Sequence, residues 1–262
     1  MKLLTAAAAV TAGVLLWGNR AMVTTEYALS PAHLPRGFRG YRIAHITDWH
    51  NAAFGKALAD RVRKARPNII CITGDMLDAR RPNVPLALDT AQRLAEIAPC
   101  YYVMGNHEDR CPLYPQFEEG LRKAGVRVLR NEAVTLTHGG DTVTLLGADD
   151  PGLRKEFPET LRSLQAQAEG CSILLCHRPE RIADYAEVGF DLVLTGHAHG
   201  GQVRLPLIGG VVAPHQGFFP RYDAGVYRQG DTLMVLSRGL GNSLCPLRVN
   251  NRPELVIVTL HA

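Results

Sequence analysis

The chain has 262 residues, of which 46% are hydrophobic and 21% are charged, and its formal net charge at pH 7 is +4. This length suits one large domain or two small ones, and the hydrophobic share is enough to bury a sizeable core. The positive excess is small and includes no run of lysine and arginine long enough to form a nucleic-acid groove, so we expect no nucleic-acid partner. The sequence points to no particular protein partner.

The first segment of the chain is apolar. Lys2 precedes a stretch, residues 3–17, that carries no charge. A basic start followed by such a stretch is typical of a signal peptide or a membrane anchor, and continuing to residue 23 approaches the ~20 residues that span a bilayer. No small-x-small cleavage motif directly follows Trp17. We therefore predict an uncleaved membrane anchor over residues 1–23, with a cleaved signal segment as the alternative.

The charges beside this segment bear on its orientation. Lys2 and the terminal amine together outweigh Arg20 on the other side. Because positive charge favours the cytoplasmic side of a membrane, this predicts that the rest of the protein lies outside the cytoplasm.

Residues 24–40 are polar and include two prolines and two glycines, which is typical of a linker. From residue 41, apolar runs of strand length alternate with segments of helical period, and this alternation predicts an α/β fold with mainly parallel strands. The predicted strands of this half are residues 41–47, 68–73 and 101–104, and the predicted helices are residues 56–65, 86–98 and 116–124.

The second half of the chain is richer in strands. A short helix is predicted near residues 180–186, and residues 138–141 predict a hairpin turn. Two packed sheets with helices outside would accommodate this many strands in one domain over residues 41–262. The predicted strands of this half are residues 126–129, 133–137, 142–146, 172–176, 191–195, 232–237 and 254–260.

Polar side chains that can bind metal ions follow five of the predicted strands. In open α/β sheets the carboxyl ends of the strands line the ligand crevice, so we expect these side chains to gather in one place. The seven residues are Asp48, His50, Asp75, Asn106, His177, His197 and His199.

The residue types indicate which metals such a cluster binds. Imidazole, carboxylate and amide ligands together suit Mn, Fe or Zn better than Ca or Mg, and the absence of cysteine argues against a structural thiolate zinc site. A carboxylate such as Asp75 can bridge two cations about 3.5–4 Å apart. A lone Asp48 would more often be a helix cap and a lone His177 a structural histidine, but the joint pattern favours ligands. His45 is predicted to be a core residue, and His215 is assigned no role.

Five blocks of the sequence, in order, resemble the calcineurin-like metallophosphoesterases. They are D-x-H at Asp48, GDxxD at Gly74, GNHE at Gly105, the lone His177 and GHxH at Gly196. The GHAHGGQ, SRGLGNS and NNRPEL segments are similar to those of small, membrane-anchored bacterial members. The resemblance covers about residues 41–260 and implies a four-layer α-β-β-α sandwich of two mixed sheets flanked by helices.

The resemblance also implies a role for each site residue. One metal ion would be held by Asp48, His50, Asp75 and His199. The second would be held by Asp75, Asn106, His177 and His197, with Asp75 bridging. His107 would face the scissile phosphate as an acid or an electrostatic stabiliser, and Asp78 or Glu108 could orient the ligands or His107 from behind.

The implied activity is hydrolysis of phosphodiester or pyrophosphate bonds by attack of a metal-bound hydroxide. The predicted anchor suggests a lipid-linked or envelope substrate. A phosphomonoesterase is the nearest alternative, and the sequence does not separate the two. A non-catalytic scaffold is a further alternative, but such members usually lose a ligand or the GNH histidine, and here all are present.

Overall fold

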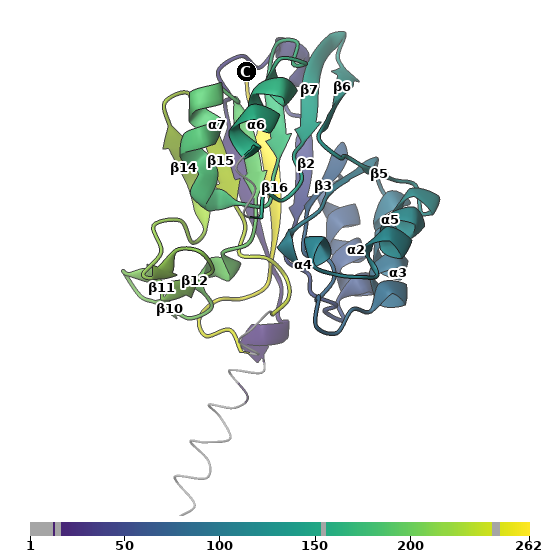
Figure 1. Ribbon diagram of the computed structural model, residues 1–262, viewed down its shortest axis with the longest axis vertical. Coiled ribbons are helices and arrows are strands. Elements are labelled where there is room, and N and C mark those ends of the chain that lie inside the picture. The colour runs from purple at the N-terminus through teal and green to yellow at the C-terminus, as the bar shows by residue number, and fades with distance from the viewer. Residues whose placement is uncertain (1–12, 14–16, 153–155, 243–246) are drawn as a thin grey trace, which may run out of the picture.

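The computed structural model describes residues 13, 17–152, 156–242 and 247–262 of the chain. Two six-stranded mixed sheets face each other, and helices cover their outer faces (Figure 1). The predicted four-layer α-β-β-α architecture is confirmed.

The first sheet has the strand order β1-β16-β2-β3-β4-β5. Strands β2 to β5 run parallel, whereas β16 is antiparallel to β2 and parallel to β1. The bounds are β1 Val23–Leu29, β16 Glu254–Leu260, β2 Arg42–Ile46, β3 Ile69–Thr73, β4 Cys100–Val103 and β5 Val126–Val128.

The second sheet has the order β14-β15-β9-β8-β7-β6, in which β7, β8, β9 and β15 are parallel and the two edge strands are antiparallel to their neighbours. The predicted hairpin joins β6 to β7. The bounds are β14 Gly225–Gln229, β15 Thr232–Leu236, β9 Leu192–Thr195, β8 Ser172–Leu175, β7 Asp141–Gly147 and β6 Glu132–His138.

Three apolar layers hold the four structural layers together. Amphipathic helices pack their buried side chains on the outer sheet faces, as Leu58 and Val62 do from α2. Between the sheets, Ile43 and Val258 share one buried cluster with Leu145 and Leu194. The helices are α2 Gly55–Ala65, α3 Val84–Ala95 and α5 Tyr114–Lys123 beside the first sheet, and α6 Phe157–Gln165 and α7 Ile182–Val188 beside the second.

The prediction of a linker over residues 24–40 is wrong. Strand β1 pairs with β16, with Tyr27 opposite Val258, and the short helix η1 (Arg36–Phe38) buries the ring of Phe38 completely in the core between the sheets. Half-buried and exposed residues alternate along β1, because it is an edge strand. Such alternation gives a polar-looking sequence. Residues 23–40 therefore belong to the domain.

The predicted anchor over residues 1–23 lies mostly outside the described residues. Within the described part of the chain, none of the helices has the length and apolar character needed to cross a bilayer.

A small lobe of short hairpins was not predicted. It extends from the shared edge of the two sheets and contains β10 Arg204–Leu205, β11 Gly209–Gly210, β12 Val212–Ala213 and β13 Gly217–Phe218. Figure 1 shows it below the second sheet, separate from the four layers. We call residues 204–219 the hairpin lobe.

Candidate metal centre

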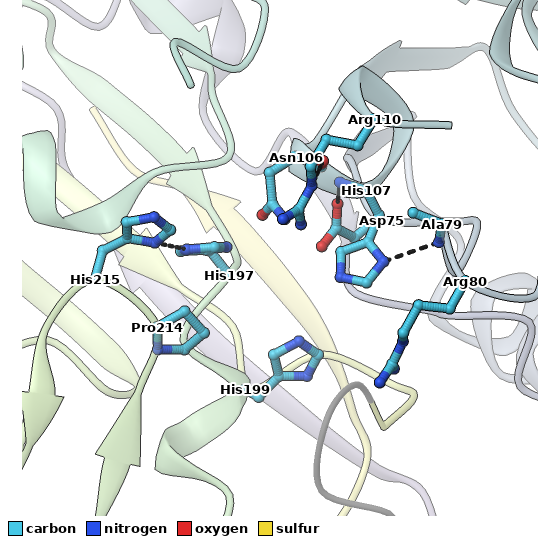
Figure 2. A pocket seen from close by; sticks show the side chains of 10 residues that line it. All are labelled: Asp75, Ala79, Arg80, Asn106, His107, Arg110, His197, His199, Pro214 and His215. Atoms are coloured by element: carbon cyan, nitrogen blue, oxygen red, sulfur yellow. Dashed lines mark hydrogen bonds between the residues drawn. The ribbon is translucent and has the colours of Figure 1, made fainter. Parts of the chain in front are cut away.

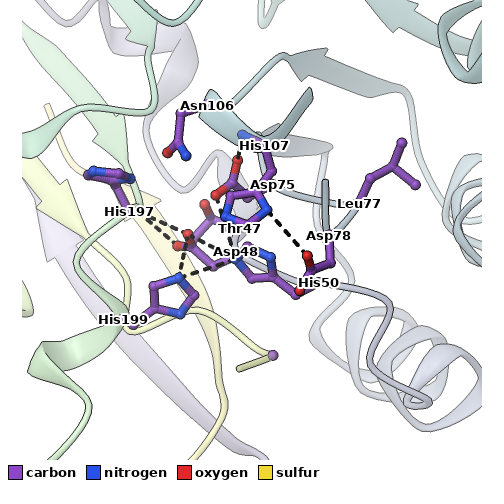
Figure 3. A network of polar contacts seen from close by, with 12 residues as sticks. Thr47, Asp48, His50, Asp75, Leu77, Asp78, Asn106, His107, His197 and His199 are labelled. Atoms are coloured by element: carbon purple, nitrogen blue, oxygen red, sulfur yellow. Dashed lines mark hydrogen bonds and ion pairs between the residues drawn. The ribbon is translucent and has the colours of Figure 1, made fainter. Parts of the chain in front are cut away.

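Strands from both sheets deliver the predicted site residues to the same edge of the molecule. Asp48 and Asp75 follow β2 and β3, and Asn106 begins the short helix α4 (Asn106–Asp109) after β4. His177 and His197 follow β8 and β9 of the facing sheet. Figure 3 shows the side chains from the two sheets pointing toward one another. The structure thus brings all seven predicted ligands together, as the strand-end argument anticipates.

The backbone at these residues is unusual. Five of the seven have a positive φ, a conformation that non-glycine residues rarely adopt and that costs of order 1 kcal/mol each. Hydrogen bonds across the site hold this geometry, for example from the His197 amide to Asp48 Oδ2 at 2.9 Å. The five φ angles are 50° at Asp48, 45° at His50, 54° at Asp75, 71° at His197 and 49° at His199.

Glycines let neighbouring strand-end turns approach closely. A Cβ added at Gly196, which follows β9 of the second sheet, would collide with the side chains of Thr47 and Asp48, which follow β2 of the first sheet. One added at Gly105 would collide with Asp75, and both of these residues follow strands of the first sheet. Glycine is therefore required at both positions by close approach. The contact at Gly196 brings ligands of the two sheets together.

The first group of donor atoms combines Asp48, His50, Asp75 and His199. The Nε2 atoms of His50 and His199 lie 3.2 Å apart. His199 Nε2 lies 3.4 Å from Asp48 Oδ1, and His50 Nε2 lies 3.5 Å from Asp75 Oδ2. All four side chains are buried, so one cation could be reached by two imidazoles and two carboxylates.

The second group combines Asp75, His177 and His197, and it shares Asp75 with the first. His177 Nε2 lies 3.3 Å from Asp75 Oδ2 and 3.2 Å from His197 Nδ1. Asn106 Oδ1 is buried beside this group and has no hydrogen-bond partner among the described residues. A buried, unpartnered carbonyl oxygen is costly unless it contacts a cation or another donor.

One hydrogen bond sets the tautomer of His177. Its Nδ1–H donates to the carbonyl oxygen of Thr73, at 2.7 Å. When the ring is neutral, the lone pair of Nε2 therefore points at Asp75 and His197. A backbone partner of this kind is the usual device for orienting a metal-binding imidazole.

The charges of the cluster favour a cation. Burial lowers the pKa of both His50 and His199 to about 3, so both imidazoles are neutral and can donate lone pairs. Burial alone would also lower the pKa of His177, but the carboxylates of Asp75 and Asp48 reverse this and raise it to about 10. In the metal-free protein a proton thus occupies the position that a metal ion would take. The donor set and the unpartnered Asn106 oxygen fit two divalent cations.

Glu108, predicted to support the site from behind, joins two of the turns. Its carboxylate accepts hydrogen bonds from the amides of Asp75 (2.8 Å), Leu77 (2.8 Å) and Gly105 (2.9 Å). Burial, followed by the nearby Asp75 carboxylate, raises the pKa of Glu108 to about 7. Glu108 therefore holds the backbone of Asp75 in place. Among the described residues, its hydrogen bonds go to backbone amides and not to the side-chain atoms of the two donor groups.

His107 lies at the rim of the cluster. Its ring centroid is 4.5 Å from that of His50, and its backbone amide donates to Asp75 Oδ1 at 2.9 Å. The Ala79 amide donates to His107 Nδ1 at 3.0 Å, which leaves the ring proton on Nε2. Asp78 Oδ1 lies 3.8 Å from the same Nδ1, so Asp78 borders the imidazole without a short hydrogen bond. Burial lowers the pKa of His107, which favours the neutral ring.

A cavity of about 390 Å³ opens onto the cluster (Figure 2). This volume suits a small ligand. A second cavity adjoins it and shares Asn106, Arg110 and His215 with the first. The first cavity is lined by Asp75, Ala79, Arg80, Asn106, His107, Arg110, His197, His199, Pro214 and His215.

Sequence reasoning missed one buried group beside the centre. Arg178 makes a two-pronged ion pair with Asp150, at 2.6 and 2.9 Å, and its Nη1 lies 2.8 Å from His215 Nδ1. His215, which was assigned no role, also lies 2.8 Å from His197 Nε2. Asp150 follows β7, another strand ending at this edge, so the strand-end rule could have found it. His45 is a buried core residue, as predicted.

Two facing sheets with histidines and aspartates gathered at their shared strand ends form the architecture of a metallophosphoesterase. The chain belongs to the calcineurin-like phosphoesterase family, whose model matches residues 41–201.

Curated relatives agree with this assignment. The chain is 30% identical over 230 residues to the phosphodiesterase YaeI of Escherichia coli, an alignment that covers 84% of this chain and 82% of the relative. It is 29% identical over 250 residues to the uncharacterized metallophosphoesterase YkuE of Bacillus subtilis, with 90% and 85% covered. Among solved structures, TT1561 of Thermus thermophilus has a TM-score of 0.52 at 10% identity, covering 76% of this chain and 90% of that one. At this identity the likeness concerns the fold alone.

Proposed function

We propose that this protein hydrolyses phosphodiester or pyrophosphate bonds with two divalent metal ions. Asp48, His50, Asp75 and His199 would hold one ion. Asp75, Asn106, His177 and His197 would hold the other. The observation that carries the proposal is the pair of buried donor groups that share Asp75.

Two adjacent divalent ions lower the pKa of water and neutralise phosphate oxygens. The chain's own residues define where a substrate would sit. Arg80 and Arg110 line the cavity beside the donor groups, so an anionic phosphate would meet positive charge on entering. Arg110 Nε donates to the Asn106 carbonyl oxygen at 2.9 Å, which holds the guanidinium at the cavity wall.

His107 would act on the leaving group. The Ala79 amide occupies Nδ1, so Nε2–H is the nitrogen that can donate a proton or a hydrogen bond to the departing oxygen. Asp78 and Glu108 would act as positioning residues, Asp78 beside the His107 ring and Glu108 behind Asp75.

Donor chemistry, the relatives and the N-terminal sequence support a choice of metal, substrate and location. The mixed nitrogen and oxygen donors favour Mn, Fe or Zn. The similarity to the phosphodiesterase YaeI supports a phosphodiester substrate. The uncharged stretch of residues 3–17 supports attachment to a membrane through this stretch. Lys2 ahead of it supports a domain on the extracytoplasmic side, and membrane attachment supports a lipid-linked substrate.

The test combines metal analysis with a substrate panel. Purified protein should contain about two transition-metal ions per chain and should cleave bis-aryl phosphates or nucleotide-lipid pyrophosphates faster than aryl monophosphates. Preference for the monoester would replace the diesterase proposal with a phosphomonoesterase.

The shared carboxylate gives the first mutational prediction. Asp75→Ala should lose most of the bound metal and nearly all turnover, because it removes a donor from both groups. Asp60→Ala, at an exposed position on α2, is the matched control and should resemble the wild type. Wild-type turnover by Asp75→Ala would show that the bridging role is wrong.

A further inference from the structure

The hairpin lobe exposes an unusual amount of apolar side chain. Leu207 is fully exposed, Phe218 is 78% exposed and Ile208 is 64% exposed. Single exposed apolar residues are common, but a contiguous group marks an interaction surface. Of the eleven large hydrophobic residues that are exposed in the described part of the chain, six lie in this lobe: Leu205, Leu207, Ile208, Val212, Phe218 and Phe219.

These side chains belong to one structural unit. Leu205 pairs with Gly209 in the first hairpin, and Val212 pairs with Phe218 in the second. The Phe219 amide donates to the Val211 carbonyl oxygen at 2.8 Å, which closes the second hairpin. The Val211 amide donates to the Val203 carbonyl oxygen at 2.8 Å, which holds this hairpin beside the start of the first. From residue 205 to residue 219 the sequence contains no Asp, Glu, Lys or Arg.

The apolar N-terminal stretch ends beside this lobe. Asn19, two residues after the stretch, exchanges two hydrogen bonds with the backbone of Arg248, at 3.0 and 2.8 Å. The next residue, Val249, pairs with Val203, and its carbonyl oxygen accepts from the Arg204 amide at 3.0 Å. Asn19 therefore contacts Arg248, and the adjacent Val249 contacts Arg204 at the start of the lobe, so the end of the apolar stretch lies close to the lobe. Figure 1 shows the purple N-terminal turn at the same end of the molecule as β10 to β12.

We propose that the hairpin lobe docks on the surface of a lipid bilayer. An uncharged group of leucine, isoleucine and phenylalanine side chains suits the boundary between headgroups and acyl chains, into which such faces sink about 5–10 Å. The uncharged stretch of residues 3–17, which ends next to the lobe, would keep the same bilayer within reach. Both features point to lipid as the partner.

Docking in this way would place the candidate metal centre at the membrane surface. Pro214 and His215 of the lobe line the cavity, so the wall of the cavity and the docking surface are parts of one short segment. The proposal does not depend on catalysis, because lipid contact can be measured without turnover.

The experiment measures whether the lobe contacts acyl chains. The full chain carries Phe218→Trp in a Trp17→Phe background, where the remaining native tryptophan, Trp49, is buried. It is mixed with phosphatidylcholine vesicles, with and without bromine on the acyl chains. We expect brominated lipid to quench the Phe218→Trp emission and plain lipid to shift it to shorter wavelength. Thr137→Trp, at an exposed site by the β6–β7 turn, is the matched control and should show neither change.

A second variant distinguishes lipid from a second copy of the chain as the partner of the hairpin lobe. Leu207→Glu with Ile208→Glu should abolish the quenching of the reporter, while the metal content and the hydrolysis of a water-soluble bis-aryl phosphate stay at the level of the parent. Unquenched Phe218→Trp emission in the presence of brominated vesicles would overturn the proposal. The proposal would also be overturned if sedimentation shows that the parent protein is a dimer and that the variant with Leu207→Glu and Ile208→Glu is a monomer. That result would assign the surface to a second copy of the chain.

Discussion

His107 and the seven proposed ligands occupy one small volume but differ in what their removal should do. The ligands supply donor atoms to the two buried groups that share Asp75, whereas His107 lies at the rim, where the Ala79 amide occupies its Nδ1 and leaves the ring proton on Nε2. Loss of a ligand should therefore lower metal content, and loss of His107 should not.

We predict that His107→Ala retains its metal but loses about 10²–10⁴-fold in turnover, the usual contribution of a general acid. The loss should be smaller for a nitrophenolate leaving group, which needs little protonation, than for an alkyl alcohol. His261→Ala, at an exposed position, is the control. An equal loss for both leaving groups would argue against proton donation by His107.

The raised pKa of His177 predicts a pH dependence of metal binding. In the metal-free protein this pKa is about 10, so His177 carries a proton at neutral pH that the metal must displace. His50 and His199, with pKa values of about 3, have no proton to release. Affinity should therefore rise with pH, by about tenfold per unit below pH 10 for one displaced proton. Calorimetry in two buffers of different protonation enthalpy would measure the number of protons released on metal binding. A metal affinity that does not change with pH would contradict displacement of the His177 proton.

Among the structural elements, strands followed by Asp, Asn or His were predictable, because a buried strand is a continuous apolar run and the polar residue marks its end. Strand β1 was not predictable in this way, since its exposed face carries polar residues such as Glu26. The hairpin lobe was missed because its strands have two residues each, too short for a periodic pattern. The pair of Arg178 and Asp150 joins residues 28 positions apart, and only the fold shows that contact.

Helix η1 allows a direct test of the corrected boundary. Phe38 is fully buried, and its ring centroid lies 4.8 Å from that of Tyr41. Phe38→Ala should lower the free energy of unfolding by about 3–5 kcal/mol, as expected for a buried aromatic residue. The exposed neighbour Arg39→Ala should change it little. Chemical denaturation measures both, and equal stability of the two variants would restore the linker interpretation.

At the scale of the whole molecule, the proposed centre bridges the two sheets. Asp48 and Asp75 follow strands of the first sheet, whereas His177 and His197 follow strands of the second. The sequence indicated which residues would lie close together. That the two sheets pack face to face, with their strand ends at one edge, follows from the packed core between them. Metal bound there would hold the two sheets to each other.

Metal removal should therefore lower thermal stability. A ligand that binds only the folded state at 100 times its Kd adds about 2.7 kcal/mol to the free energy of unfolding. We expect a chelator to lower the Tm of the wild type in scanning calorimetry. The chelator should leave the Tm of Asp75→Ala unchanged, and an equal shift in both proteins would indicate that the stabilising metal binds elsewhere.

The position of β16 has a consequence for synthesis on the ribosome. This strand lies between β1 and β2, although more than 200 residues separate it from β2 in the chain. Until residues 254–260 emerge, β2 has an open edge whose amides and carbonyls can pair with another nascent chain. A pause in translation before these codons would keep that edge exposed for longer, and pairing with another nascent chain would then compete with the native pairing to β16.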